Sequence, residues 1–211
     1  MTWEPFCTNE NIIALGKPLF VTDEHLQVAT HVCGVRSVLC RTPEVDRYLA
    51  NTAITLRNDY DADTGLYDGI LYIMYRQENE RIIPLYIGKT EKIGKKGVLS
   101  SLLKGPAPKP RWDDGPDYHI GGLSTCVCAG YTDSSKKNYG KWAKALFSNP
   151  PSPTPQLNYP VYLWLRLWKT GETGLWTEFG PTPLCLQEIL LINLVAKLFP
   201  NDILNTEGLL R

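Results

Sequence analysis

The arrangement of this chain is indicated most clearly by two tyrosine-rich runs, Gly69-Ile70-Leu71-Tyr72-Ile73-Met74-Tyr75 and Pro84-Leu85-Tyr86-Ile87-Gly88-Lys89-Thr90. Isoleucine, leucine and tyrosine are enriched in strands, and the polar segment between the runs has the length of a hairpin loop. We therefore expect strands over residues 69–76 and 83–88, paired as antiparallel neighbours. Such pairing would bring Tyr72 and Tyr86 close together.

The charge of the chain is balanced overall but unevenly distributed. Residues 81–111 contain eight lysines and arginines and a single acid, Glu91, out of totals of 22 basic and 22 acidic residues. A locally positive segment on an acidic body suits the docking of a polyanion at one face. A solvated lysine loop would explain the same composition.

No feature of the sequence is typical of a secreted or membrane protein. The start, Met1 to Cys7, has neither a basic region nor a long apolar region, and no apolar run approaches ~18 residues. The six cysteines are too sparse for a disulfide scaffold and lack zinc spacing. We expect a cytoplasmic protein with reduced, mostly buried thiols and no membrane partner.

Hydrophobic periodicity and helix-end signals predict the remaining elements. Asp59 to Gly65 forms a polar turn whose three acids also suggest a calcium loop, but the EF-hand pattern is not completed, which favours a solvated turn. Five prolines between 149 and 160 predict an extended loop. The predicted helices cover 43–60, capped by Thr42, 136–147, and 183–199, capped by Thr182; the predicted strands cover 123–129 and 161–168.

Two further features have a structural and a functional interpretation. One face of the strand over 161–168 carries Tyr162, Trp164, Arg166 and Trp168, which could stack nucleobases or pack under helices. Glu188 lies in a helix that is apolar on all sides and hence largely buried. A buried carboxylate has to be paired, hydrogen-bonded or bound to a cation, and a structural salt bridge or a helix-dipole partner is the alternative to a functional role.

These residues, taken in order, resemble the GIY-YIG nuclease family. The first run matches the first motif with Tyr72 in the tyrosine place and Gly69 one residue early, and Tyr86-Ile87-Gly88 matches the second motif fully. Glu188, followed by an apolar pair, Pro200 and Asn205, resembles the final helix of the family. The resemblance covers roughly residues 66–207.

The resemblance implies a role for each matched residue. Tyr86 and Tyr72 would orient or deprotonate the attacking water, and Glu188 would hold a single divalent cation, Mg²⁺ or Mn²⁺, that polarises the scissile phosphate. Lys89, with the lysines that follow it, would contact DNA, and Asn205 would support the site and its DNA contacts.

The sequence departs from the family at the arginine that usually follows Tyr-Ile-Gly by one or two helical turns. That window contains Lys92, Lys95 and Lys96 but no arginine. The resemblance then points to Arg111, delayed by an insertion, as the group that neutralises charge on the phosphorus. A lysine replacement is the alternative and lacks the planar fork that suits phosphate. His119 resembles a base or water-positioning histidine of some restriction-enzyme members, and a polar packing role would explain it equally.

The sequence therefore predicts an α/β (α+β) protein with a small, mainly antiparallel central sheet flanked by helices. Residues 1–65 would be an N-terminal extension for DNA contact or dimerisation, and residues 66–211 a GIY-YIG-like nuclease domain with a Pro-rich insertion at about 106–160. The size resembles type II restriction endonucleases of the family, so the expected function is metal-dependent cleavage of double-stranded DNA, with a homodimer as one assembly. The alternatives are a catalytically decayed nucleic-acid-binding or regulatory protein and a nuclease effector or phage-defence component.

Overall fold

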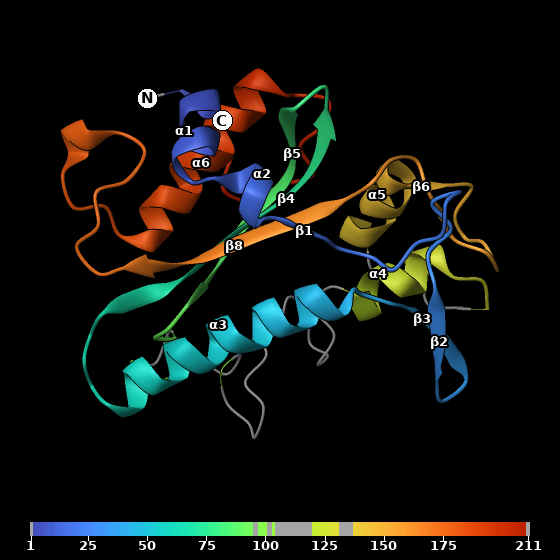
Figure 1. Ribbon diagram of the computed structural model, residues 1–211, viewed down its shortest axis with the longest axis horizontal. Helices are drawn as coiled ribbons and strands as arrows, with labels where there is room; N and C mark the ends of the chain where they lie inside the picture. Colours follow the sequence, from blue (N-terminus) through green and yellow to red (C-terminus); the bar gives the residue numbers. More distant parts are fainter. Residues whose placement is uncertain (1, 95–96, 101–102, 104–119, 131–136, 210–211) are drawn as a thin grey trace. The chain divides into compact units, whose positions relative to one another are not determined.

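The protein, described here by a computed structural model, combines helices with an antiparallel sheet (Figure 1). The predicted α+β class is therefore confirmed. The description covers most of the chain, in the ranges 2–94, 97–100, 103, 120–130 and 137–209.

The chain divides into two compact units, and the boundaries differ from the predicted one at residue 65. Trp3, near the start of the chain, lies in the same apolar core as the tyrosine strands, and Tyr48 hydrogen-bonds the carbonyl of Leu165 in that unit. Residues on both sides of position 65 thus belong together. The first unit consists of residues 1–17, 47–110 and 162–211, and the second of residues 18–46 and 111–161.

The first unit is built around a four-stranded sheet in the order β1-β8-β4-β5. Strand β4 (Tyr67–Glu78) pairs antiparallel with β5 (Arg81–Glu91) on one side and with β8 (Tyr162–Lys169) on the other, while β1 (Lys17–Pro18) extends the edge. All three strands predicted in this region are confirmed. Every residue from 70 to 75 is buried, as expected for a strand covered on both faces.

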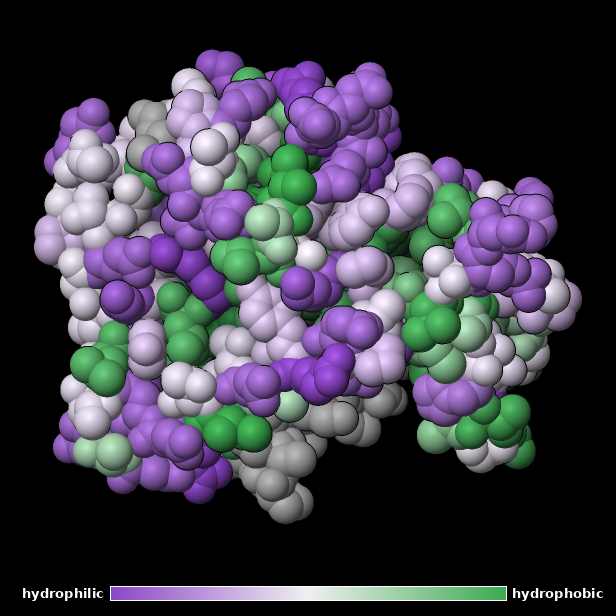
Figure 2. Space-filling model, in the orientation of Figure 1, coloured by the Kyte–Doolittle hydropathy of each residue, from purple (hydrophilic) through white to green (hydrophobic). Residues whose placement is uncertain are grey.

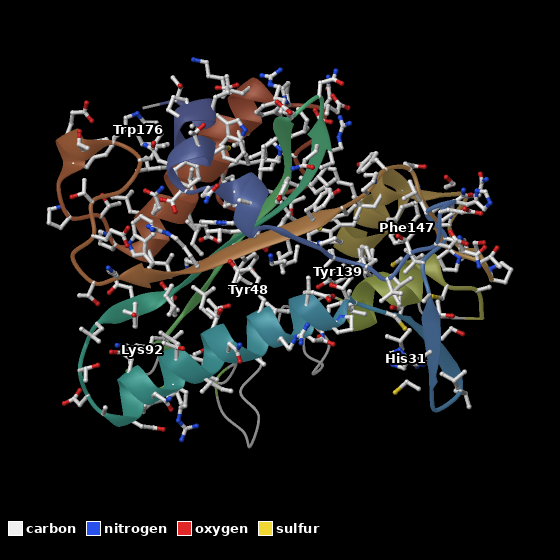
Figure 3. All side chains as sticks on the ribbon, viewed as in Figure 1. His31, Tyr48, Lys92, Tyr139, Phe147 and Trp176 are labelled. Atoms are coloured by element: carbon white, nitrogen blue, oxygen red, sulfur yellow. The ribbon has the colours of Figure 1, made fainter. Side chains whose placement is uncertain are left out.

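Helices cover both faces of this sheet. Helices α1 (Trp3–Asn9), α2 (Ile12–Leu15) and α6 (Leu184–Leu198) lie on one side of β4 and β8, and α3 (Pro43–Asp61) lies on the other (Figure 1). Tyr48 points from α3 toward β8 (Figure 3). The main apolar core lies between the first group of helices and the sheet and includes Trp3, Phe6, Ile73, Trp164, Trp168, Leu191 and Val195.

The ends of the two long helices follow different rules. Thr42 caps α3 as predicted, because its Oγ1 accepts a hydrogen bond from the backbone N–H of Val45 at 3.3 Å. The predicted Thr182 cap of α6 is wrong. Pro183 occupies the N-cap position, and the hydroxyl of Thr182 instead donates to the carbonyl of Gly180 in the loop after the 3₁₀ helix η2 (Thr177–Phe179).

The aromatic face of β8 packs inside the unit. Trp164 and Trp168 are fully buried, and Trp168 Nε1 donates to the carbonyl of Thr182 at 2.9 Å. Arg166 lies 4.8 Å from the Trp168 ring centroid and forms ion pairs with Glu10 and Glu172. These contacts favour the packing interpretation over base stacking.

The second unit contains short strands and two helices. The hairpin of β2 (Thr30–Cys33) and β3 (Arg36–Leu39) is joined to α4 (Ile120–Val127) by a hydrogen bond from the Leu39 N–H to Ser124 Oγ. Helix α5 (Lys137–Leu146) confirms the helix predicted there and leads into β6 (Phe147–Ser148), which pairs with β7 (Gln156–Leu157). The hairpin presents apolar residues at the surface (Figure 2), where Val35 is 99% exposed.

The strand predicted over 123–129 is wrong, because residues 120–127 form α4. Ile120, Leu123 and Val127 recur at helical spacing and are all buried. In a segment this short, helical and strand periodicities overlap, and the helical one is the one that buries the apolar residues.

The cysteines are free, as predicted, but only Cys7 and Cys128 of the six are buried. The expectation of mostly buried thiols is therefore wrong. Within the described ranges, no helix combines the length and apolar character needed to cross a membrane.

Candidate active site

The two motif tyrosines meet on the β4–β5 hairpin, as predicted. Met74 is the register partner of Tyr86, and Tyr72 is the partner of Gly88, so the two tyrosines are diagonal neighbours on the sheet. Their ring centroids are 6.2 Å apart and the rings are inclined by 24°. The pair is therefore stacked, with Tyr72 buried and Tyr86 half-buried.

The glycines of the two motifs have a steric explanation. A Cβ atom at position 88 would overlap the phenol ring of Tyr72, which lies directly over the backbone there. A Cβ atom at position 69 would collide with the carbonyl of Thr90 and come within 2.6 Å of Leu184 Cδ2. Gly88 thus makes room for a site tyrosine, and Gly69 lets α6 approach the sheet.

Helix α6 packs against β5 and places Glu188 beside Lys89. The Oε2 atom of Glu188 lies 3.9 Å from Lys89 Nζ. Burial raises the pKa of Glu188 to about 7, because the effect of Lys89 only partly offsets it and the negative charges of Glu91 and Glu207 add to it. The side chain remains 19% exposed, so its carboxylate is reachable from solvent.

The electrostatics of the tyrosine pair follow from the same acids. Burial raises the pKa of Tyr86 to about 12, and the negative charges of Glu188 and Glu207 contribute, while a hydrogen bond from Tyr72 acts in the opposite direction. The phenol of Tyr86 is consequently protonated at neutral pH. It can donate a hydrogen bond there but is a poor general base.

Asn205 clamps the strand that carries the second motif. Its Oδ1 accepts from the backbone N–H of Ile87 at 3.0 Å, and its Nδ2 donates to the carbonyl of the same residue at 2.8 Å. The adjacent Leu204 N–H donates to the carbonyl of Leu85 at 2.7 Å. The amide side chain thus makes the pair of hydrogen bonds that a neighbouring strand would make to Ile87, and it holds the backbone next to Tyr86 in place.

The predicted DNA-binding lysines have different environments. Lys89 Nζ lies 3.1 Å from Glu91 and near Glu188, at the site itself. Lys92 is buried, and its Nζ lies 2.5 Å from Asp59 Oδ2, so an internal ion pair holds it and it is not available to DNA. Lys95, Lys96, Arg111 and His119 lie outside the described residues.

The polar turn after α3 is an anchor for the sheet. Asp59 is buried and accepts hydrogen bonds from Lys92, Thr64 and the backbone N–H of Leu66. Burial alone would raise its pKa, but these hydrogen bonds outweigh it and lower the pKa to about 2. The prediction of a solvated turn is wrong for Asp59, and Figure 3 shows Lys92 beside the end of α3.

Sequence reasoning missed two acids beside Glu188. Glu91 follows Lys89 by two residues on β5, so the alternation of a strand places both on one face, and this signal was available in the sequence. Glu207 follows the end of α6 in an irregular segment, and no local pattern links it to Glu188.

The donor set suits a cation held by one carboxylate. Among the described residues, no three His, Cys, Asp or Glu side chains are grouped so as to hold a metal ion. Glu188 offers an oxygen ligand that is reachable from solvent, and the ammonium of Lys89 lies 3.9 Å from it. A Mg²⁺ ion that keeps most of its water ligands fits such a site.

Comparison with known proteins gave no match among family models, curated proteins or solved structures.

Proposed function

We propose that this protein is a metal-dependent endonuclease that hydrolyses phosphodiester bonds in DNA, with a GIY-YIG-like site. The proposal is carried by one observation: Glu188, from a helix far along the chain, lies against Lys89, on the strand that holds Tyr86 stacked on Tyr72. Asn205 fixes the same strand through Ile87. The family resemblance relates these residues only by their order in the sequence, and in the structure they are neighbours in space.

Each described residue has a defined task in this proposal. Glu188 would hold the cation, which supplies a Lewis acid to the scissile phosphate when bound. Tyr86, protonated at neutral pH, would donate a hydrogen bond that orients the attacking water or a phosphate oxygen. Lys89 would exchange its contacts with Glu91 and Glu188 for the DNA backbone. Arg111 and His119 complete the proposal as charge-neutralising and water-positioning groups.

The test is cleavage of supercoiled plasmid in Mg²⁺ or Mn²⁺. Glu188→Gln keeps the shape of the side chain but removes the charge, and we expect it to abolish cutting. Glu178→Gln, an exposed acid in the same unit, is the matched control and should cut at the normal rate. Because cation binding requires ionised Glu188, the cleavage rate at limiting metal should rise with pH up to about 7 and then level off. Unchanged cutting by Glu188→Gln contradicts the assignment.

A second candidate is a DNA-binding protein without turnover. The raised pKa of Tyr86 and the ion pairs of Lys89 with two carboxylates favour it. A protonated Tyr86 is a poor base, and a paired Lys89 is not free to contact a phosphate. It predicts salt-dependent DNA binding with no metal-dependent product in the plasmid assay.

A further inference from the structure

The second unit contains a long stretch of sequence without acids. No Asp or Glu occurs between Ser134 and Gly171, and the part of this stretch that lies in the second unit carries four lysines, at positions 136, 137, 141 and 144. Three of these positions are in α5, one helical turn apart from one another. The helix is therefore strongly cationic.

The burial pattern of α5 separates its apolar and charged faces. Trp142, Ala143 and Leu146 are buried against the rest of the unit, whereas Lys141 and Lys144 are exposed. We refer to the exposed side formed by Lys141 and Lys144 as the α5 lysine face. With the aromatic ring of Trp142 turned inward, this face offers charge and little apolar area.

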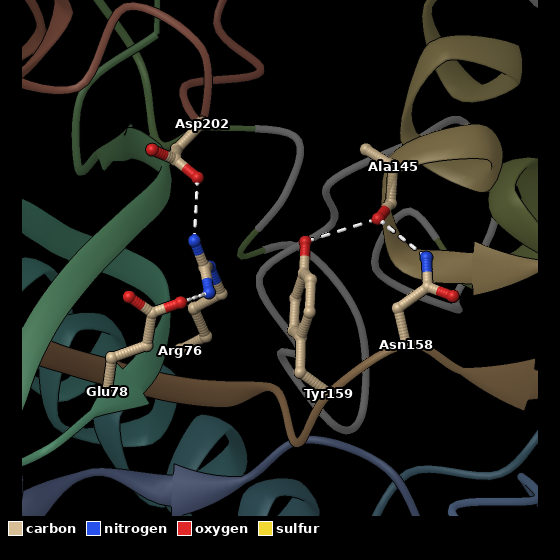
Figure 4. Close-up of polar contacts among 6 residues, drawn as sticks. All are labelled: Arg76, Glu78, Ala145, Asn158, Tyr159 and Asp202. Atoms are coloured by element: carbon tan, nitrogen blue, oxygen red, sulfur yellow. Dashed lines mark hydrogen bonds and ion pairs between the residues drawn. The ribbon is translucent and has the colours of Figure 1, made fainter.

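Hydrogen bonds fix the C-terminal end of α5. The carbonyl of Ala145 accepts from the hydroxyl of Tyr159 at 3.2 Å and from Asn158 Nδ2 at 3.1 Å (Figure 4). The following residue pair, Phe147 and Phe20, meets edge to face. Lys141 and Lys144 are therefore presented by a rigid element, which lowers the entropy that their side chains and backbone lose on binding.

The charge of the α5 lysine face is uncompensated within the part of the chain that the structure describes, where Lys141 and Lys144 form no ion pair. Two acids of the second unit have partners of their own. Asp23 accepts the backbone N–H groups of His25 and Gln27, and Asp46 lies 2.7 Å from Arg41. Lys92 in the first unit differs in this respect, because its charge is neutralised by the ion pair with Asp59.

We propose that the α5 lysine face binds the phosphate backbone of DNA. The inference rests on the proposed function and adds a surface that would hold its substrate. Lys92, one of the lysines predicted to contact DNA, is instead occupied by its ion pair with Asp59. A protein partner would need apolar or aromatic anchors at the centre of its interface, which this face lacks. A phosphate backbone needs only fixed cations, and it contributes affinity without sequence information.

The experiment measures binding of a fluorescent DNA duplex by anisotropy, with EDTA present so that no cleavage occurs, over a series of salt concentrations. The variant Lys141→Gln/Lys144→Gln removes both charges. We expect it to weaken binding about tenfold at low salt and to lower the slope of log K against log salt by about two, because each phosphate contact contributes ~0.9. The matched control is Lys169→Gln/Lys197→Gln, which removes two exposed lysines of the first unit.

The outcomes separate this inference from the proposed function. Loss of affinity and slope in the α5 variant alone supports it, even if the wild-type protein fails to cut plasmid. Equal losses of affinity in the two variants would mean that only total charge matters, and would overturn the inference. The inference is also overturned if the α5 variant is folded, still cleaves, and binds DNA as tightly as the wild type. Polyglutamate that competes as well as unlabelled duplex, at equal charge, would overturn the assignment to DNA.

Discussion

Glu188 combines burial with a charge that its surroundings disfavour. Because its pKa is about 7 in the folded protein and about 4.5 without the fold, the folded state binds a proton more tightly between these pH values. The associated stability is present below about pH 4.5 and is lost as the pH rises through 7. Near neutral pH the protein thus gives up stability to keep this carboxylate, which is typical of functional groups.

The first prediction concerns Glu188→Gln, which removes this penalty. We expect the free energy of unfolding at pH 8 to exceed that of the wild type by on the order of 2–3 kcal/mol, with little difference at pH 4.5. Urea unfolding at both pH values measures it, with Glu178→Gln as the control. A variant that is less stable than the wild type at pH 8 would show that Glu188 is a structural ion-pair partner of Lys89.

The second prediction concerns Gly88→Ala. The added methyl group overlaps the Tyr72 ring, so we expect a loss of about 1–3 kcal/mol in the free energy of unfolding, the usual cost of overpacking. In a Tyr72→Ala background the same change should cost much less, because the ring is gone. Equal costs in both backgrounds, measured by chemical unfolding, would mean that backbone conformation rather than the ring selects glycine here.

The motif residues could be placed from sequence because strand alternation and hairpin pairing are local rules. Tyr72 and Tyr86 are neighbours on the hairpin, as those rules predict, whereas the position of Glu188 beside Lys89 depends on the packing of α6 against β5. Lys92 could not be placed, because its partner Asp59 lies 33 positions earlier and the two meet only when α3 and β5 pack together. A lysine in a basic segment gives no local sign that it is buried.

The end of α3 is tied to the sheet by the ion pair of Asp59 and Lys92. Breaking a buried pair by removing one partner leaves an uncompensated charge, whereas replacing both partners by apolar residues often costs little. The low pKa of Asp59 adds a pH dependence: its contribution is present above about pH 4 and is lost as the pH falls through 2.

The third prediction follows from this pair. Lys92→Met should lower the free energy of unfolding by about 3–5 kcal/mol. Asp59→Asn/Lys92→Met should recover part of the loss, because the amide oxygen can still accept from Thr64 and from the backbone N–H of Leu66. Thermal unfolding at pH 7 tests this. In acid titrations Asp59→Asn should remove a stability term of roughly 2 kcal/mol between pH 4 and 2. A titration that the substitution leaves unchanged would contradict the assigned pKa.

Long elements were easier to predict than short ones. Helix α3 has a proline at its first position and a threonine cap, and Pro200 follows the C-cap residue Phe199 of α6, so these helix ends were visible in the sequence. Helix α4 has eight residues and neither signal, and its periodicity alone did not separate a helix from a strand.

The two units differ in how strongly their strands are held. Strand β4 is hydrogen-bonded on both edges and buried on both faces, whereas all four residues of β2 are exposed and β3 is its neighbour in a two-stranded sheet. An isolated two-stranded hairpin is marginally stable in water. The local stability should therefore be lower in that hairpin than in β4.

The fourth prediction is a matching pattern of amide hydrogen exchange. Amides of Ile70 to Tyr75 should exchange at least roughly a hundredfold more slowly than those of Val32 and Cys33, because they open only with the whole unit. Mass spectrometry of exchanged peptides measures both. Comparable protection in the two strands would mean that the hairpin is stabilised by a partner such as a second copy of the chain.

The division into units was not visible in composition, because each unit is assembled from separated segments. Residues 1–17 and 162–211 join the first unit, and 111–161 returns to 18–46. Such exchanges are set by packing between distant segments. Two of the boundaries follow Pro-rich stretches, at 105–110 and 149–160, but composition does not indicate which segments join. The predicted boundaries followed sequence order, which the fold does not.

The central position of β4 also sets the order in which the chain can fold. One edge of β4 pairs with β5 across a short turn. The other edge pairs with β8, with Tyr67 opposite Lys169, and the chain passes through the second unit before it reaches β8. Closing so long a loop is slow. Until β8 docks, an apolar strand edge is open to other chains. Recovery from denaturant should accordingly depend on protein concentration, with aggregation competing against the arrival of a single strand.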